Sequence, residues 1–296
     1  MSLSDFCIEA TFIVTFHKSS SVKPLPNQSV NHTSILTPVS SHCGRGRFAR
    51  GLIPRPLTIT WLLLLLLLGS PWVLAQSTED YAEARRAMVR EVQDNFRSTA
   101  SMINQATMDP AVEQALQRVP RHEFVPPDQK TRAYLNQPLP IGHGQTISQP
   151  YIVALMTDLL DLKKGDVVLE IGTGSGYHAA VLAELAKEVY TIEIIEPLGL
   201  QAAERFKRLG YKNIETRIAD GYYGWKEHAP FDAIVVTAAA SHIPPPLVQQ
   251  LKPGGKMIIP VGSHFLTQYL VMVEKDRNGV IRTRELLPVM FVPLKH

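Results

Sequence analysis

The residues best suited to chemistry lie around a glycine-rich turn near the middle of the chain. An apolar run at 166–171 leads directly into Gly172-Thr173-Gly174-Ser175-Gly176, and a helical pattern follows. Such a turn lets a ligand lie against bare main chain at a helix N-terminus. A second apolar run carries Glu193, 21 residues after Gly172, where a carboxylate can accept both hydroxyls of a ribose. The pattern therefore predicts an adenosine-bearing cofactor at the carboxyl edge of a sheet.

Spacing and charge indicate which cofactor binds. The glycines follow G-x-G-x-G, whereas the dinucleotide fingerprint is G-x-G-x-x-G. Glu170 would repel a pyrophosphate but attract a sulfonium or ammonium group, by roughly 1–4 kcal/mol. We therefore expect S-adenosylmethionine in preference to NAD. Asp220-Gly221, after a third apolar run, could meet the adenine amino group, and an ordinary Asp-Gly turn accounts for the pair equally well.

The elements that must position these groups alternate between strand and helix. The sequence predicts five strands and three intervening helices, then an antiparallel pair around the turn at 277–279. The predicted strands are 166–172, 189–195, 214–220, 231–239 and 256–262, the helices 177–186, 198–210 and 244–255, and the terminal pair 268–276 and 283–293. This order predicts an α/β fold with a doubly wound, mainly parallel, Rossmann-like sheet. Helices within 77–118, one capped by Asp109 with Pro110 at its first position, make 76–136 an N-terminal helical cap.

The first 75 residues have a different character. We expect 1–44 to be disordered or to follow from a wrongly assigned start codon. In 45–75, four arginines precede an apolar core at 61–68 and a small-residue site ending at Ala75, the layout of a secretory signal. Left uncleaved, residues 57–75 would be long enough to contact or span a membrane, at about 20 residues per span. The globular body is then 76–296.

Composition excludes several classes of function. Six of the 30 Lys and Arg residues and two of the 27 Asp and Glu residues lie in 1–75, which leaves 24 basic and 25 acidic residues in the body. A body so close to neutral gives no support for binding nucleic acid. Cys7 and Cys43 both lie outside the body, so disulfides, zinc–thiolate sites and a cysteine nucleophile are excluded there, and we expect no metal.

The body resembles the protein-L-isoaspartate (D-aspartate) O-methyltransferase family over roughly residues 85–294. The matching segments are VLEIGTGSGYHAAVLA, ADG, FDAIVVTAAA, LKPGGKMIIPVG, RVPRHEFVP, MFVPL and, most specifically, PLPIGHGQTISQPYIVALMTDLL. The last is a segment without helix or strand periodicity, rich in hydroxyl, imidazole and amide groups. The resemblance implies that it closes over the cofactor and that Ser148 is the active-site serine.

The same resemblance implies a reaction and a set of contacts. The methyl group of S-adenosylmethionine would pass to the free carboxylate of isoaspartyl or D-aspartyl residues in damaged proteins, which are the expected partners of a monomeric enzyme. The implied cofactor contacts are Thr146, Glu170, Gly172, Gly174, Glu193, Ile194, Asp220 and Gly221. Tyr151 falls where some relatives have a histidine near the cofactor.

Alternatives remain open at this level. A carboxylate is ionised at neutral pH and needs no general base, so Ser148 is expected to orient it, although the same serine could cap the following helix. His143, between two glycines, is expected to help the loop close. Another S-adenosylmethionine-dependent methyltransferase, acting on RNA or a small metabolite, is the nearest rival. Family and cofactor supply favour the cytoplasm, whereas the segment 45–75 favours export or inner-membrane attachment.

Overall fold

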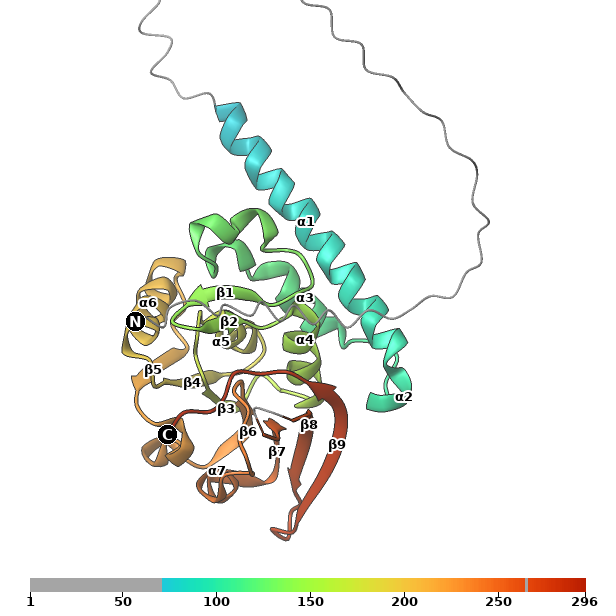
Figure 1. Ribbon diagram of the computed structural model, residues 1–296, viewed down its shortest axis with the longest axis vertical. Coiled ribbons are helices and arrows are strands. Elements are labelled where there is room, and N and C mark those ends of the chain that lie inside the picture. Colours follow the sequence, from blue (N-terminus) through green and yellow to red (C-terminus); the bar gives the residue numbers. More distant parts are fainter. Residues whose placement is uncertain (1–70, 264–265) are drawn as a thin grey trace, which may run out of the picture. The chain divides into compact units, whose positions relative to one another are not determined.

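A seven-stranded sheet with the order β5-β4-β3-β6-β7-β8-β9 forms the centre of the body in the computed structural model, which describes residues 71–263 and 266–296 (Figure 1). The first five strands of the chain in this sheet run parallel, whereas β8 and β9 are antiparallel. The strands are β3 (Val167–Ile171), β4 (Glu188–Glu193), β5 (Ile214–Ile218), β6 (Phe231–Val236), β7 (Leu251–Val261), β8 (Gln268–Lys275) and β9 (Ile281–Val289). The predicted doubly wound sheet with a terminal antiparallel pair is confirmed.

Helices cover both faces of the sheet because its parallel strands are apolar on both sides. Along β3, Val168 packs into one core with α4, α5 and α6, and Leu169 packs into a second core with α7. Side chains of a strand alternate between faces, so one short apolar run supplies both cores. The covering helices are α4 (Pro150–Leu159), α5 (Tyr177–Ala183), α6 (Glu196–Leu209) and α7 (Pro245–Gln250), with short turns η3 (Gly221–Tyr223) and η4 (Lys226–His228).

The N-terminal helices pack on α4 as a cap. Met88, Val92 and Phe96 of the first helix are almost fully buried in the same core as α4 and α3. The cap consists of α1 (Pro71–Ser98), α2 (Ala100–Ile103), α3 (Pro110–Arg118), η1 (Arg121–Glu123) and η2 (Pro127–Arg132). The side chain of Asp109 accepts a hydrogen bond from Ala111 N at 2.6 Å, with proline at the first helical position, as the sequence predicts.

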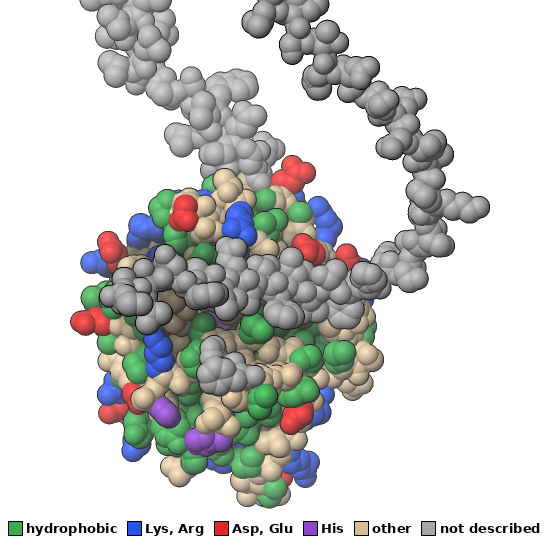
Figure 2. Space-filling view, viewed as in Figure 1, with side chains coloured by type: hydrophobic (Ala, Val, Ile, Leu, Met, Phe, Trp, Pro, Cys, Tyr) green, Lys and Arg blue, Asp and Glu red, His purple; other side chains and the backbone are tan. Residues whose placement is uncertain are grey.

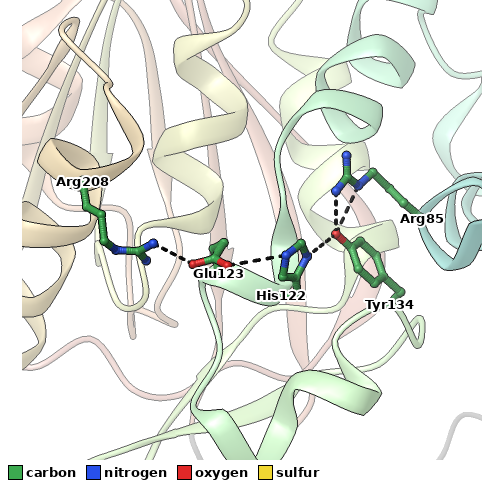
Figure 3. A network of polar contacts seen from close by, with 5 residues as sticks. All are labelled: Arg85, His122, Glu123, Tyr134 and Arg208. Atoms are coloured by element: carbon green, nitrogen blue, oxygen red, sulfur yellow. Dashed lines mark hydrogen bonds and ion pairs between the residues drawn. The ribbon is translucent and has the colours of Figure 1, made fainter. Parts of the chain in front are cut away.

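A network of polar contacts joins the cap to the body (Figure 3). Arg85 of α1 donates to the Tyr134 hydroxyl at 3.1 and 3.0 Å, and His122 Nδ1 lies 2.8 Å from the same hydroxyl. Glu123 then pairs with Arg208 of α6 at 2.8 Å. Burial lowers the pKa of His122, so this imidazole is neutral at pH 7 and acts as a hydrogen-bonding group.

Two predicted elements differ from the structure. The segment 138–150, expected to be an irregular loop, contains the antiparallel hairpin β1 (Leu139–Gly142) and β2 (Gln145–Ile147). Positive φ angles of 91°, 53° and 69° at Gly142-His143-Gly144 make its turn. The helix predicted within 244–255 was expected to stop at Pro253 and Gly254, but it ends earlier, at Gln250, because Leu251 pairs with Phe231 and begins β7.

The predicted N-terminal segments lie largely outside the described residues. This holds for all of 1–44 and for the arginines and apolar core of 45–75. Among the helices that the structure does describe, none combines the length and the hydropathy needed to cross a bilayer. The signal-like segment therefore stays a prediction.

Candidate active site

A cleft with about 750 Å³ of empty space opens at the carboxyl edge of the parallel strands. The β1–β2 hairpin, the glycine turn after β3, the ends of β4 and β6, and the last residues of the chain line it. Eight of the predicted site residues line this one cleft: Thr146, Ser148, Glu170, Gly172, Gly174, Glu193, Ile194 and Gly221.

Close packing under the glycine turn explains its composition. Gly172 has a φ of 97°, and a Cβ there would lie 2.4 Å from Thr237 Oγ1. That hydroxyl lies 2.6 Å from Gly172 O and 3.0 Å from Ile171 O, so Thr237 of the neighbouring strand end holds the turn. A Cβ on Gly221 would meet Ile171 Cγ2 at 2.4 Å. Both glycines keep main chain close to the cleft.

Glu193 binds the glycine turn through one carboxylate oxygen and the main chain just after β4 through the other. Oε2 accepts from Gly174 N at 2.7 Å, and Oε1 accepts from Ile195 N at 2.9 Å. The carboxylate is therefore fixed at the tip of β4, beside the turn, with lone pairs remaining for further donors. Ile194 next to it is 40% exposed and offers an apolar wall to the cleft.

Glu170 is a fully buried carboxyl group with one oxygen unsatisfied. Its Oε2 accepts from the Thr191 hydroxyl at 2.5 Å, whereas Oε1 has no hydrogen-bond partner among the described residues. Burial, with a contribution from the nearby charge of Glu193, raises the pKa of Glu170 to about 8. An orphaned acceptor of this kind suits a ligand that brings a positive charge or a donor, which would restore the ionised form.

The hairpin brings Ser148 to the cleft, held by its main chain. Arg121, which is fully buried, donates from Nη2 to Ser148 O at 2.7 Å and from Nε to Ala133 O at 2.9 Å. The Ser148 hydroxyl makes no hydrogen bond within the described part of the chain. Interpreting it as a helix cap is wrong, because the N-cap of α4 is Gln149 and no side chain caps that helix.

Arg121 also contacts the element that follows the glycine turn. Its guanidinium lies 4.7 Å from the ring centroid of Tyr177, the first residue of α5. Burial lowers the pKa of Arg121 to about 10, which leaves a cation at neutral pH. One side chain thus connects the Ser148 hairpin to the helix that follows the glycine turn. Sequence reasoning missed it, although an arginine within the apolar, proline-rich RVPRHEFVPP was a visible signal.

His178 lines the cleft and is a second residue that the sequence reasoning missed. Its Nε2 lies 3.0 Å from Thr157 Oγ1, and Thr157 itself donates to Val153 O. The imidazole must therefore be the donor to Thr157, which leaves Nδ1 as a buried acceptor without a partner. Burial lowers the pKa of His178 to about 3, so this ring is neutral and no general acid at neutral pH.

Three residues considered from the sequence lie outside the cleft lining. Asp220 Oδ1 accepts from Tyr222 N at 2.9 Å and caps η3, which matches the simple-turn interpretation. Tyr151 is buried against Phe96 of α1, and its hydroxyl lies 2.5 Å from Oγ1 of Thr99, just after that helix. His143 is exposed at the tip of the hairpin.

The end of the chain completes the cleft. Ala239 N donates to Val292 O, and Leu294 N donates to Ala239 O, both at 2.8 Å. These bonds lay residues 292–295 along the carboxyl edge of the sheet, where they line the site. No local pattern could have shown this return of the chain.

Charge around the body is mixed. On the visible face in Figure 2, basic and acidic side chains are interspersed and no extended patch of one sign appears. Within 71–263 and 266–296, no cluster of His, Cys, Asp or Glu could hold a metal ion.

Comparison with known proteins identifies the family. The model of the protein-L-isoaspartate(D-aspartate) O-methyltransferase family matches residues 98–296. Protein-L-isoaspartate O-methyltransferase 1 of Cupriavidus necator is 59% identical over 241 residues, 81% of this chain and 93% of its own. Protein-L-isoaspartate O-methyltransferase 2 of a Polaromonas species is 62% identical over 207 residues, 70% of this chain and 98% of its own.

A solved structure agrees with the sequence comparisons. It is a Plasmodium falciparum protein assigned to the protein-L-isoaspartate O-methyltransferases, in complex with S-adenosyl-L-homocysteine. It superposes with a TM-score of 0.58 and 30% identity, covering 69% of this chain and 97% of its own. Since the family model spans the sheet, the hairpin and the cleft, this chain belongs to the protein-L-isoaspartate(D-aspartate) O-methyltransferase family.

Proposed function

We propose that the chain transfers a methyl group from S-adenosylmethionine to the free carboxylate of L-isoaspartyl and D-aspartyl residues in damaged proteins. Family membership and the S-adenosyl-L-homocysteine in the related structure support this assignment. The observation that carries it is a single cleft lined by both Glu170, whose buried Oε1 has no partner among the described residues, and Ser148, whose hydroxyl is uncommitted.

The carboxyl edge of the sheet would hold the cofactor. S-adenosylmethionine supplies an electron-poor methyl group on a sulfonium. Glu170 would accept from or pair with its positive end, and Glu193 would accept from its ribose hydroxyls while still bound to the turn. The main chain is bare of side chains at Gly172, Gly174 and Gly221, so a ligand could lie directly against it. The remaining proposed cofactor contacts are Thr146, Ile194 and Asp220. Asp220 would make its contact while its side chain also caps η3.

Ser148 would orient the substrate. An isoaspartyl carboxylate has an ordinary pKa near 4, is ionised at neutral pH and attacks without a base. The chain must then fix one carboxylate oxygen, direct the other along the line of transfer and exclude water. Positioning of this kind can contribute about 7–11 kcal/mol in favourable cases. The Ser148 hydroxyl is free to donate, and Arg121 fixes the peptide that carries it.

A paired assay tests the proposal. The chain is given tritiated S-adenosylmethionine with a synthetic isoaspartyl peptide or with its normal aspartyl twin. We expect label in base-labile methyl esters of the isoaspartyl peptide alone. Equal labelling of both peptides, or of neither, would contradict the assignment. RNA and small carboxylic acids serve as the other acceptors, and label in them would favour the rival methyltransferase activities.

The place of action is a separate proposal. Family and cofactor supply favour the cytoplasm, and the signal-like 45–75 favours export. Cell fractionation followed by N-terminal sequencing of the mature protein decides between them. A first residue at Gln76 in an exported fraction would establish cleavage, and a start near residue 1 or within 1–44 in the cytoplasm would exclude it.

A further inference from the structure

The turn between β8 and β9 contains an asparagine followed by glycine, and this pair occurs once in the entire sequence. The turn spans Asp276 to Val280 at the end of the terminal hairpin, which projects at the lower tip of the body in Figure 1. Residues 277–280 are all exposed. A Cβ placed on Gly279 would meet nothing within 4 Å, so the amide that follows Asn278 is sterically open.

We propose that Asn278 is a site of isoaspartate formation, so that this enzyme carries in its own hairpin the lesion it acts on in other proteins. The second half of this inference rests on the proposed function. The first half rests on peptide chemistry alone: a side-chain amide one residue before an unhindered glycine nitrogen.

Formation of isoaspartate at Asn278 needs no reagent other than water. Gly279 N attacks Asn278 Cγ, the N–Cγ bond forms, and the Cγ–Nδ2 bond breaks. The Gly279 amide proton leaves with the amide group as ammonia, which yields a succinimide. Water then opens either carbonyl of the ring. Opening at the former main-chain carbonyl leaves the chain running through Cγ and frees an α-carboxylate, which is the isoaspartyl group.

Hydrogen bonds to Asp276 hold the turn closed, and they should therefore limit the rate of succinimide formation. Its Oδ1 accepts from Asn278 N at 2.9 Å and from Val280 N at 3.0 Å, and its main-chain O accepts from Gly279 N at 2.9 Å. Gly279 N must leave that bond before it can attack. The described turn thus slows a reaction that the sequence favours, and opening of the turn permits it.

The chain offers an internal contrast at its one Asp-Gly pair. Gly221 is buried, a Cβ there would lie 2.4 Å from Ile171, and the Asp220 carboxylate is bound by Tyr222 N. Ring closure at Asp220 would require movement inside the packed site. Succinimide formation requires the residue after the asparagine or aspartate to move. Gly279 in the exposed hairpin can move, whereas Gly221 in the buried turn is held by packing.

Repair of this lesion must occur between molecules. β8 begins at the carboxyl edge, where Tyr269 pairs with Val261, and ends at the amino edge, where Glu274 pairs with Lys256. Its 8 residues span roughly 25 Å at about 3.3 Å each. The turn at Asn278 thus lies at the end of the sheet opposite the cleft, and only the cleft of a second copy can reach it.

Ageing the purified full-length chain without cofactor tests the first step. Mass spectrometry of the tryptic peptide Asn278–Arg282 should show conversion of the amide at residue 278 to a carboxylic acid. The fragmentation pattern should be that of isoaspartate at this residue. Asn278→Gln, which cannot form the five-membered ring, should stay intact. Asp276→Ala should form the lesion about tenfold faster, because opening no longer breaks hydrogen bonds to a carboxylate. Absence of isoaspartate at residue 278, or an unchanged rate in Asp276→Ala, would overturn the inference.

Fresh enzyme and tritiated S-adenosylmethionine test the second step. Aged wild-type chain should accept label in proportion to its isoaspartate content, at a rate that rises with the concentration of fresh enzyme, and aged Asn278→Gln should accept little. A synthetic isoaspartyl peptide is assayed in parallel. If the peptide is labelled and the aged chain is not, self-repair is wrong. If neither is labelled, the proposed function fails, while the lesion itself has already been measured independently.

Discussion

Protonation of Glu170 should control cofactor binding. This carboxyl is fully buried, its Oε1 has no partner among the described residues, and its pKa is raised to about 8. A cationic ligand group favours the ionised form, so binding must release the proton that Glu170 holds below that pH. The affinity should therefore fall about tenfold for each pH unit below the raised pKa, or roughly a hundredfold from pH 8 to pH 6.

Calorimetry with S-adenosylhomocysteine, which does not react and keeps the amino-acid ammonium, measures this slope. Glu170→Gln is the matched control, because it keeps the shape and the Thr191 contact but cannot titrate. The variant should bind more weakly at pH 8 and show a flat profile, apart from any titration of the ligand itself. Equal slopes in the two proteins, or no slope in the wild type, would refute the argument.

The same pKa shift predicts that the stability of the unliganded protein changes with pH in the opposite direction to its cofactor affinity. The folded protein holds a proton on Glu170 up to about pH 8, whereas an unfolded glutamate releases it near its ordinary value of 4.5. The free energy of unfolding without ligand should therefore fall as pH rises through that window, by up to a few kcal/mol. Denaturant unfolding of Glu170→Gln should lack this loss, so the variant is the more stable protein at pH 8. A wild type that gains stability through the window would show that the pKa shift has the wrong sign.

Three further substitutions separate the proposed roles. Ser148→Ala should lower kcat on an isoaspartyl peptide by roughly 10- to 100-fold with little change in cofactor affinity, since one hydrogen bond to a charged group is lost; collapse of that affinity with normal turnover would contradict the role. Glu193→Ala should weaken cofactor binding by about 1–3 kcal/mol in calorimetry, and an unchanged dissociation constant would exclude the ribose contact. Arg121→Lys keeps the charge but not the forked donors, so it should raise KM for the peptide and cost about 2 kcal/mol of stability to denaturant. Loss of cofactor affinity alone in Arg121→Lys would show that it supports the turn and not the hairpin.

The sequence by itself determined the order of elements and several of the residues that line the cleft. The glycine turn, Glu170 and Glu193 follow strands directly, and parallel strands end at one edge, so a local pattern brought these groups together. The N-cap at Asp109 and the terminal hairpin were equally local. Each depends on contacts between residues that are neighbours along the chain or in adjacent strands.

Only the tertiary structure decided how Ser148 is held and what closes the cleft. Arg121 reaches the Ser148 carbonyl across 27 positions of sequence. Residues 292–295 return over the sheet to line the site. The physical reason is that a buried polar group takes whichever partner packing places beside it, and no periodicity in the sequence encodes that partner.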